Sequence, residues 1–240
     1  MLTFTAGEKT LEYFDISDPF FADVIETVRQ RTLTLTSGVE AAWALYQSIG
    51  YLVRNDIPGD IVECGVWQGG SMLLAAYSLM HFGDTSRRIW LYDTFNGMAK
   101  PGELDMRCDG VPALPTWQEF ERNGRKWGFG GSQEHVRNVV FSSGYPCENF
   151  VFVEGMVEDT LPATRPDAIG LLRLDTDLYS STYAELAHLY PLLSTGGVLI
   201  IDDYGWLLGA QIATDQYIAE RKLPLFLTRI NESVRLVVKP

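Results

Sequence analysis

Short apolar runs alternate with segments of helical periodicity between residues 59 and 222. The runs predict strands over 59–66, 87–95, 148–155, 169–175 and 196–202, and helices are expected over 69–83, 181–193 and 209–222. Strands that are apolar almost throughout and alternate with helices are typical of a parallel sheet covered on both faces. Two last runs, 223–228 and 233–239, flank Asn231-Glu232 and predict an antiparallel hairpin at the sheet's edge. The sequence therefore predicts an α/β fold with a mostly parallel seven-stranded sheet.

The rest of the chain is expected to add to one domain, 1–240. Residues 1–55 are predicted to form a helical cap, with a helix start at Asp18-Pro19 and helical spacing over 38–55. Residues 99–148 break the alternation, and an insertion of this length in a compact domain is usually a lid or a disordered loop. Four aromatic residues favour a lid that packs against the rest of the protein over a disordered loop: Trp117, Phe120, Trp127 and Phe129.

Charge and length exclude several classes of protein. With 19 basic and 31 acidic residues the net charge is −12, which disfavours nucleic acid and anionic membranes as partners. No apolar stretch approaches the roughly 20 residues that span a bilayer. The first residues have neither the basic nor the apolar region of a secretory signal. Cys64, Cys108 and Cys147 are too few and too irregularly spaced for a disulfide framework, so reduced thiols in a cytoplasmic protein are expected.

Acidic residues gather where the predicted strands end. In an open parallel sheet, ligands bind beyond the carboxyl ends of the strands, so these side chains should face one cleft. The set comprises Glu63, Asp93, Glu154, Asp175, Asp177, Asp202 and Asp203.

The glycine-rich segment "VECGVWQGGS" follows the first parallel strand. Such a turn lets a ligand approach the backbone, and the following helix favours an anion. The glycines at 65, 69 and 70 do not fit the G-x-G-x-x-G spacing of dinucleotide-binding proteins. Glu63, just before them, favours a cation instead. A ligand with both an ammonium and a carboxylate, such as S-adenosylmethionine (SAM), suits this turn; a tight turn beside a core-edge acid is the alternative.

Asp93 ends the second parallel strand. Nucleotide-binding α/β domains place an acid there to accept hydrogen bonds from the ribose hydroxyls. The alternative is an aspartate that caps a helix. Its position after the glycine-rich turn favours ribose.

Two pairs of aspartates end neighbouring strands. Carboxylates that converge in a partly dry cleft repel one another, and a divalent cation resolves the repulsion. Oxygen ligands without His or Cys favour Mg²⁺ or Mn²⁺, with Asp175, Asp202 and Asp203 as ligands. Asp177 is then the general base for a hydroxyl of the acceptor. Capping and ion pairing at strand ends are the alternative.

Three other residues near these acids are weaker candidates. Tyr179 and Trp206 flank the acid pairs and could line a substrate pocket, although large aromatic residues are more often core. His135, in the insertion, is a spare candidate for a base.

The segments "GDIVECGVWQGGS", "LYDTFNGM", "VEGMVEDTLP" and "RLDTDLYSSTYAELAHLYPLLSTGGVLIIDDYG" together resemble the macrocin O-methyltransferase family. These are SAM- and Mg²⁺-dependent enzymes that methylate hydroxyls on deoxysugars of antibiotics. The resemblance implies a Rossmann-like methyltransferase sheet. It also implies metal ligands at Asp175, Asp202 and Asp203, a base at Asp177, and SAM binding by Glu63, Gly65, Ser71 and Asp93, with Gly155 near the adenine.

The activity implied is methyl transfer to a hydroxyl of a deoxysugar on a small glycosidic natural product. A catechol-type O-methyltransferase shares the layout and is the first alternative. A nicotinamide-dependent oxidoreductase and a non-catalytic SAM-binding module are the others. A homodimer is expected from family analogy alone.

Overall fold

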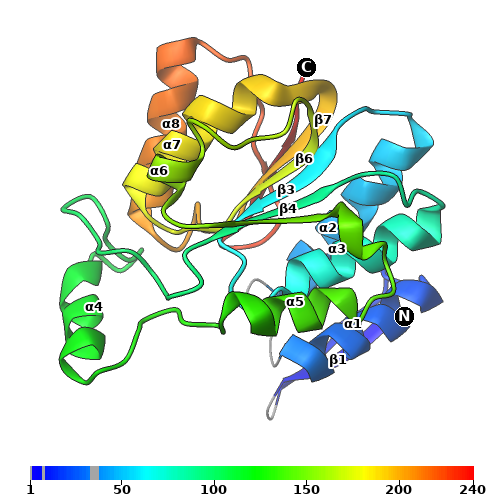
Figure 1. The fold of residues 1–240 in the computed structure, drawn as a ribbon, viewed down its shortest axis with the longest axis horizontal. Helices are drawn as coiled ribbons and strands as arrows, with labels where there is room; N and C mark the ends of the chain where they lie inside the picture. The colour runs from blue at the N-terminus through cyan, green and yellow to red at the C-terminus, as the bar shows by residue number, and fades with distance from the viewer. Residues whose placement is uncertain (1, 7–8, 33–37) are drawn as a thin grey trace.

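A computed structural model describes residues 2–6, 9–32 and 38–240. Seven strands form a sheet in the order β5-β4-β3-β6-β7-β9-β8 (Figure 1). Strands β3 to β7 run parallel, whereas β9 pairs antiparallel with both β7 and β8. The predicted sheet and its antiparallel C-terminal hairpin are confirmed. The strands are β3 Asp60–Cys64, β4 Ile89–Asp93, β5 Phe150–Glu154, β6 Ile169–Leu174, β7 Leu193–Ile201, β8 Thr228–Arg229 and β9 Arg235–Val238.

Helices cover both faces of the sheet (Figure 1). One face carries α1 Pro19–Thr32, α2 Gly38–Arg54, α3 Gly70–Phe82 and α5 Gln133–Phe141, which pack in one core with Ile61, Leu171 and Ile200. The other face carries α6 Val157–Thr160, α7 Tyr179–Leu189 and α8 Leu208–Arg221, which pack with Val62, Leu172 and Leu199. Consecutive residues of a strand point to opposite faces, so a strand buried on both sides is apolar at nearly every position.

The N-terminal segment differs from the predicted helical cap. Strands β1 Leu2–Ala6 and β2 Lys9–Tyr13 pair as an antiparallel hairpin before α1 begins. Their sequences, LTFTA and KTLEY, alternate apolar and polar residues with the period of a strand and contain Thr, Phe and Tyr, which favour strands. The predicted start of α1 is confirmed, because Oδ1 of Asp18 accepts hydrogen bonds from the amides of Phe20 and Phe21.

The insertion divides into two structurally different parts. It contains α4 Ala113–Arg122, in which only Ala113 is buried, and α4 stands away from the sheet at the left of Figure 1. By contrast, α5 buries Val136, Val139 and Val140 in the core. Parallel strands need a crossover connection, and α5 provides it between β4 and β5. The predicted boundary of 99–148 was therefore too long, because its last part is a structural layer.

Two smaller features complete the fold. The predicted strand 223–228 is reduced to the short β8, and Pro224 within that run lacks the amide that a strand interior requires. The 3-10 turns η1 Cys147–Asn149 and η2 Tyr190–Leu192 precede β5 and β7. In the part of the chain that the structure describes, no helix has the length and apolar character needed to cross a membrane.

Candidate active site

The predicted acidic residues other than Glu154 lie around the point where the strand order of the sheet reverses, whereas Glu154 is exposed at the end of the edge strand β5. Strands β3 and β6 are neighbours, while the chain first runs from β3 to β4 and β5 on the other side. The amide of Asp175 donates to the carbonyl of Cys64 at 2.8 Å, and the amide of Asp202 donates to the carbonyl of Leu174 at 2.9 Å. These bonds hold the two acid-bearing loops at the crevice where α/β sheets bind their ligands.

Gly65 is required by close packing of the main chain. Its φ is +82°, and a Cβ at this position would lie 2.0 Å from the carbonyl oxygen of Asp175. The sequence predicted a glycine that lets a ligand approach. The structure shows that the group nearest to it is the loop that carries Asp175.

Arg173 joins three of the predicted acids. Its Nη1 donates to Oε1 of Glu63 and Oδ2 of Asp175, both at 2.6 Å, and its Nη2 donates to Oδ1 of Asp202 at 2.5 Å. Glu63 and Arg173 are register partners on β3 and β6, so their side chains lie on the same face. Burial favours neutral groups, yet the three carboxylates raise the pKa of Arg173 and keep it charged. The sequence analysis missed this residue, although a single arginine in the apolar run "IGLLRLD" was the available signal.

A second group of acids lies beside this cluster. Asp175, Asp177 and Asp203 each present a carboxylate oxygen, and these oxygens all lie within 4.8 Å of one another. Carboxylates this close repel one another unless a proton or a cation lies between them. Burial and the neighbouring carboxylates raise the pKa of Asp177 to about 7 and that of Asp203 well above its usual value. Among the described residues, the buried Oδ2 of Asp203 has no hydrogen-bond partner.

Asp177 has an unusual backbone conformation. Its φ is +71°, in the left-handed region that few residues other than glycine adopt. Strain of this kind costs on the order of 1–3 kcal/mol and gathers at functional sites. This conformation turns Asp177 toward Asp175 and Asp203, whereas Asp202 is held by Arg173.

Asp93 closes onto the glycine-rich turn. Its Oδ2 accepts from the amides of Val66 at 2.6 Å and Trp67 at 3.0 Å, and its Oδ1 accepts from the amide of Phe95 at 2.6 Å. A carboxylate has about four acceptor sites, so one site remains for a ligand hydroxyl. The predicted role on the ribose hydroxyls stays a prediction, and in this conformation one acceptor site is left for it. The amide of Gly155 donates to the carbonyl of Asp93 at 2.9 Å, which places the predicted adenine-side residue beside it.

Glu63 and the start of α3 offer opposite charges to a ligand. Oε2 of Glu63 is buried and has no hydrogen-bond partner within the described part of the chain. Ser71 is the second residue of α3, whose N-cap is Gly69, and no described side chain caps this helix. Uncapped amides at a helix N-terminus bind anions, and an unpaired carboxylate oxygen suits an ammonium.

The insertion borders the turn that carries these groups. A Cβ on Gly130 would lie 2.4 Å from Cδ1 of Trp67, so this glycine rests directly on the Trp67 ring. Nε2 of Gln133 donates to Oε2 of Glu154 at 3.5 Å, near the end of β5. The insertion therefore contacts the glycine-rich turn after β3 and the end of β5.

The weaker candidates lie outside the acid cluster. The hydroxyl of Tyr179 donates to Oε1 of Gln216 at 2.7 Å, so this side chain reaches α8. Trp206 is 49% exposed, and the guanidinium of Arg107 lies 5.6 Å from its ring. His135 is exposed on α5, and the three cysteines are free thiols.

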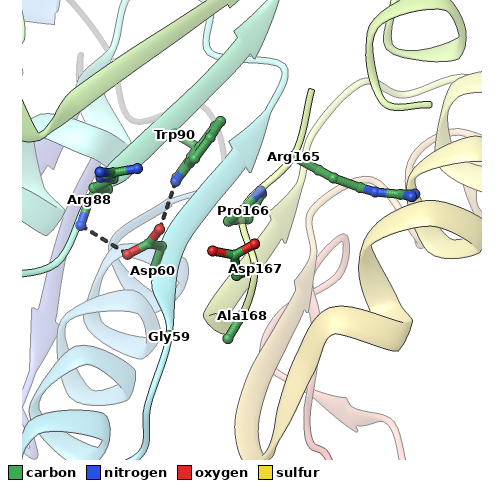
Figure 2. Close-up of a pocket in the computed structure, with 8 residues that line it drawn as sticks. All are labelled: Gly59, Asp60, Arg88, Trp90, Arg165, Pro166, Asp167 and Ala168. Atoms are coloured by element: carbon green, nitrogen blue, oxygen red, sulfur yellow. Dashed lines mark hydrogen bonds between the residues drawn. The ribbon is translucent and has the colours of Figure 1, made fainter. Parts of the chain in front are cut away.

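A cavity at the opposite edge of the sheet does not fit a functional site. It has a volume of about 370 Å³ and lies between Gly59–Asp60 and the segment 165–168. Asp60 already accepts hydrogen bonds from the amide of Arg88 and from Nε1 of Trp90. The side chain of Arg165 points away from Asp60 (Figure 2). This edge holds the amino ends of the strands, whereas ligands of such sheets bind at the carboxyl ends.

Comparison with solved structures defines the class of protein. The O-methyltransferase NovP is 31% identical, with a TM-score of 0.73 over 84% of this chain and 80% of NovP. The calicheamicin methyltransferase CalS11 shares the fold, with a TM-score of 0.63 over 98% of both chains, at 20% identity. The strand order, the antiparallel end of the sheet and these neighbours make the chain a class I α/β methyltransferase.

Sequence comparison identifies the family. The macrocin O-methyltransferase (TylF) family model matches residues 34–236, and the chain belongs to this family. Demethyldecarbamoylnovobiocin O-methyltransferase of Streptomyces niveus is 34% identical over 76% of this chain and 67% of its own length. A tetracenomycin rhamnosyl 4'-O-methyltransferase of Streptomyces olivaceus is 38% identical over 64% of this chain, but over only 56% of its own length. The predicted family is confirmed, and with it a SAM-dependent O-methyltransferase.

Proposed function

We propose that this enzyme transfers the methyl group of SAM to a hydroxyl of a sugar carried by a small natural product, with Mg²⁺ bound at the acid cluster. The observation that carries the proposal is a charge imbalance at the switch point of the sheet. Three carboxyl groups (Glu63, Asp175 and Asp202) share the guanidinium of Arg173, and two more (Asp177 and Asp203) lie beside Asp175 with no ion pair among the described residues. The similar proteins of S. niveus and S. olivaceus are named for methylation of glycosylated natural products.

The residues around the crevice fit SAM. The unpaired Oε2 of Glu63 suits the ammonium of its methionyl part, and the uncapped amides at Gly70 and Ser71 suit its carboxylate. Asp93 has one acceptor site left for a ribose hydroxyl, and Gly155 follows at the adenine side. Gly65 contributes by holding the Asp175 loop against the turn.

The donor set fits a hard divalent cation, because it consists of carboxylate oxygens alone. Asp175 and Asp203 serve as ligands in either of two arrangements. The sequence pattern gives Asp202 as the third ligand, whereas the geometry gives Asp177, whose oxygen lies with those of Asp175 and Asp203. When bound, Mg²⁺ lowers the pKa of a hydroxyl that coordinates to it.

The chemical step needs a base and an aligned methyl group. In the arrangement with Asp202 as the third ligand, Asp177 is left to accept the proton of the acceptor hydroxyl. The acceptor oxygen forms a bond to the methyl carbon while the carbon–sulfur bond breaks, which leaves S-adenosylhomocysteine. Positioning of the two reactants in one crevice supplies much of the rate.

Two matched substitutions test the roles of the acids. Mg²⁺ and S-adenosylhomocysteine are titrated by calorimetry into wild type, Asp177→Asn and Asp202→Asn. If Asp177 is the base, Asp177→Asn binds both ligands normally and loses turnover, and Asp202→Asn loses Mg²⁺. If Asp177→Asn loses Mg²⁺ binding and Asp202→Asn keeps it, Asp177 is the ligand and its role as base is wrong.

Substrate tests separate the classes of enzyme. Turnover with SAM is expected on deoxysugar glycosides and not on catechol. Methylation of catechol alone would place the enzyme in the catechol class, and binding of NAD(P) without SAM would make it an oxidoreductase. A homodimer and a cytoplasmic location stay predictions.

A further inference from the structure

Asp105 lies in the insertion and is almost completely buried, with 3% of its surface exposed. Its Oδ1 accepts from the amide of Tyr179 at 2.7 Å, and its Oδ2 accepts from the amide of Gly102 at 2.7 Å. Its own carbonyl accepts from the amide of Ala113 at 2.9 Å. A buried carboxylate is costly unless hydrogen bonds compensate it, and both oxygens of Asp105 have such a bond.

Asp105 contacts the beginnings of three helices. Tyr179 is the first residue of α7, Ala113 is the first residue of α4, and Gly209 is the second residue of α8. A Cβ on Gly209 would lie 2.0 Å from Oδ1 of Asp105, so α8 also packs directly on the carboxylate. Helix N-termini carry partial positive charge, which stabilises a carboxylate placed between them.

These helix starts follow the two acid-bearing loops. Tyr179 comes two residues after Asp177, and Gly209 comes six residues after Asp203. The insertion pairs with the second loop at further points: the amide of Leu208 donates to the carbonyl of Met106, and that of Cys108 donates to the carbonyl of Trp206, both at 2.8 Å. One buried side chain from the insertion thus connects both loops.

We propose that Asp105 is a positioning residue of the active site. Its carboxylate fixes the α7 loop against the α8 loop and thereby sets the distance between Asp177 and Asp203. The docked insertion is then part of the acid cluster's support. This inference rests on the proposed function, because it assigns Asp105 to the Mg²⁺ site described above.

The first test replaces the carboxylate. Asp105→Asn turns one acceptor oxygen into an amide donor that faces an N–H group. Mg²⁺ is titrated into the S-adenosylhomocysteine complex, and hydrogen exchange is followed in residues 102–112 and 203–209. Loss of a residue that orients metal ligands weakens metal affinity roughly tenfold. We expect Asp105→Asn to lose Mg²⁺ affinity by this factor and to exchange amide hydrogens faster in both segments. Its affinity for S-adenosylhomocysteine, measured with a chelator present, should be unchanged. Glu103→Gln, an exposed control two residues away, should change none of these.

A second pair of variants keeps Asp105 in place. Tyr179→Pro removes the amide that Asp105 binds, at a first helical position where proline is tolerated. Tyr179→Ala keeps that amide and removes the same side chain. If Asp105→Asn does not fold, these two variants test the inference instead. We expect the weaker Mg²⁺ affinity for Tyr179→Pro and not for Tyr179→Ala.

Three outcomes separate the proposals. If Asp105→Asn and Tyr179→Pro bind Mg²⁺ as tightly as wild type, Asp105 only anchors the insertion and the inference is wrong. If exchange rises in 102–112 but not in 203–209, the coupling between the loops is also wrong. If wild type itself binds neither Mg²⁺ nor S-adenosylhomocysteine, the proposed function fails, and the exchange data still decide whether Asp105 links the two loops.

Discussion

At the scale of single residues, the guanidinium of Arg173 holds three carboxylates in a buried part of the sheet. Removal of one partner from a buried ion cluster leaves uncompensated charge, which costs about 3–5 kcal/mol. We expect Arg173→Met to lower the free energy of unfolding by about this amount in urea titrations. Arg122→Met, on the exposed part of α4, should change it by less than about 0.5 kcal/mol. A loss below about 1 kcal/mol for Arg173→Met would mean that the acids hold protons in place of the guanidinium.

Glu185 is a buried acid outside the acid cluster. It accepts a hydrogen bond from Oγ1 of Thr176 at 2.8 Å, and its Oε2 has no partner among the described residues. Burial, with the added repulsion of Glu158 on α6, raises its pKa from 4.5 to about 8. Cys64 on β3 and Asp177 lie near enough for their charges to interact with that of Glu185. The folded protein therefore keeps this group protonated where the unfolded chain has released the proton.

The sign of the pH effect follows from that difference. Between pH 4.5 and about 8 the folded state binds one more proton at Glu185 than the unfolded state, so this group's contribution to stability falls as pH rises. The slope is at most about 1.4 kcal/mol per pH unit. Glu185→Gln removes it, so the variant should gain stability over wild type steadily from pH 5 to 8 in urea unfolding with chelator present. Parallel curves for the two proteins would show that Glu185 is ionised in the fold.

At the scale of elements, the contact between the β3 turn and the Asp175 loop determines which residue fits at position 65. Gly65 and Gly83 have nearly the same left-handed φ, +82° and +86°, but a Cβ on Gly83 would meet nothing within 4 Å. Gly83→Ala should cost only the strain of that conformation, about 1–2 kcal/mol. Gly65→Ala adds a collision with the Asp175 carbonyl and should cost clearly more, with loss of S-adenosylhomocysteine binding in calorimetry. Equal costs for the two variants would refute the close contact.

The elements that the sequence predicted correctly are those with strong periodic patterns. Strands buried on both faces are apolar at nearly every position, so β3 to β7 and the acids at their ends could be placed together. The hairpin of β1 and β2 was missed because its alternating pattern is short and a helical pattern follows it directly. α5 was assigned to a lid because the requirement for a crossover helix between β4 and β5 is known only once those strands are seen to be parallel neighbours.

The site was predictable in composition and less so in pairing. The location of the aspartates could be predicted from the sequence, since parallel strands bring their carboxyl ends together. The partner of each acid could not be predicted, because Arg173 reaches Glu63 across 110 positions and Asp105 reaches Tyr179 across 74. Asp93 shows the same limit, as its three amide donors depend on how the turn after β3 folds back.

At the scale of the whole molecule, the net charge of −12 offers a competing explanation for any stabilising effect of Mg²⁺. Every cation screens the repulsion of a strongly acidic protein, whereas a specific ligand stabilises only the folded state that binds it. A cation at about a hundred times its Kd adds about 2.7 kcal/mol to the free energy of unfolding. For a chain of this size each kcal/mol raises the Tm by about 2–4 °C.

We therefore expect millimolar Mg²⁺ to raise the Tm of wild type by several degrees and that of Asp203→Asn much less. NaCl at equal ionic strength provides the matched control for screening. Asp203 has a buried carboxylate oxygen without a hydrogen-bond partner among the described residues, so its neutralisation removes a proposed ligand and changes the net charge by only one. If NaCl stabilises wild type as much as Mg²⁺ does, or if Asp203→Asn keeps the full Mg²⁺ effect, the stabilisation comes from screening of the molecule's charge and the acid cluster holds no ion.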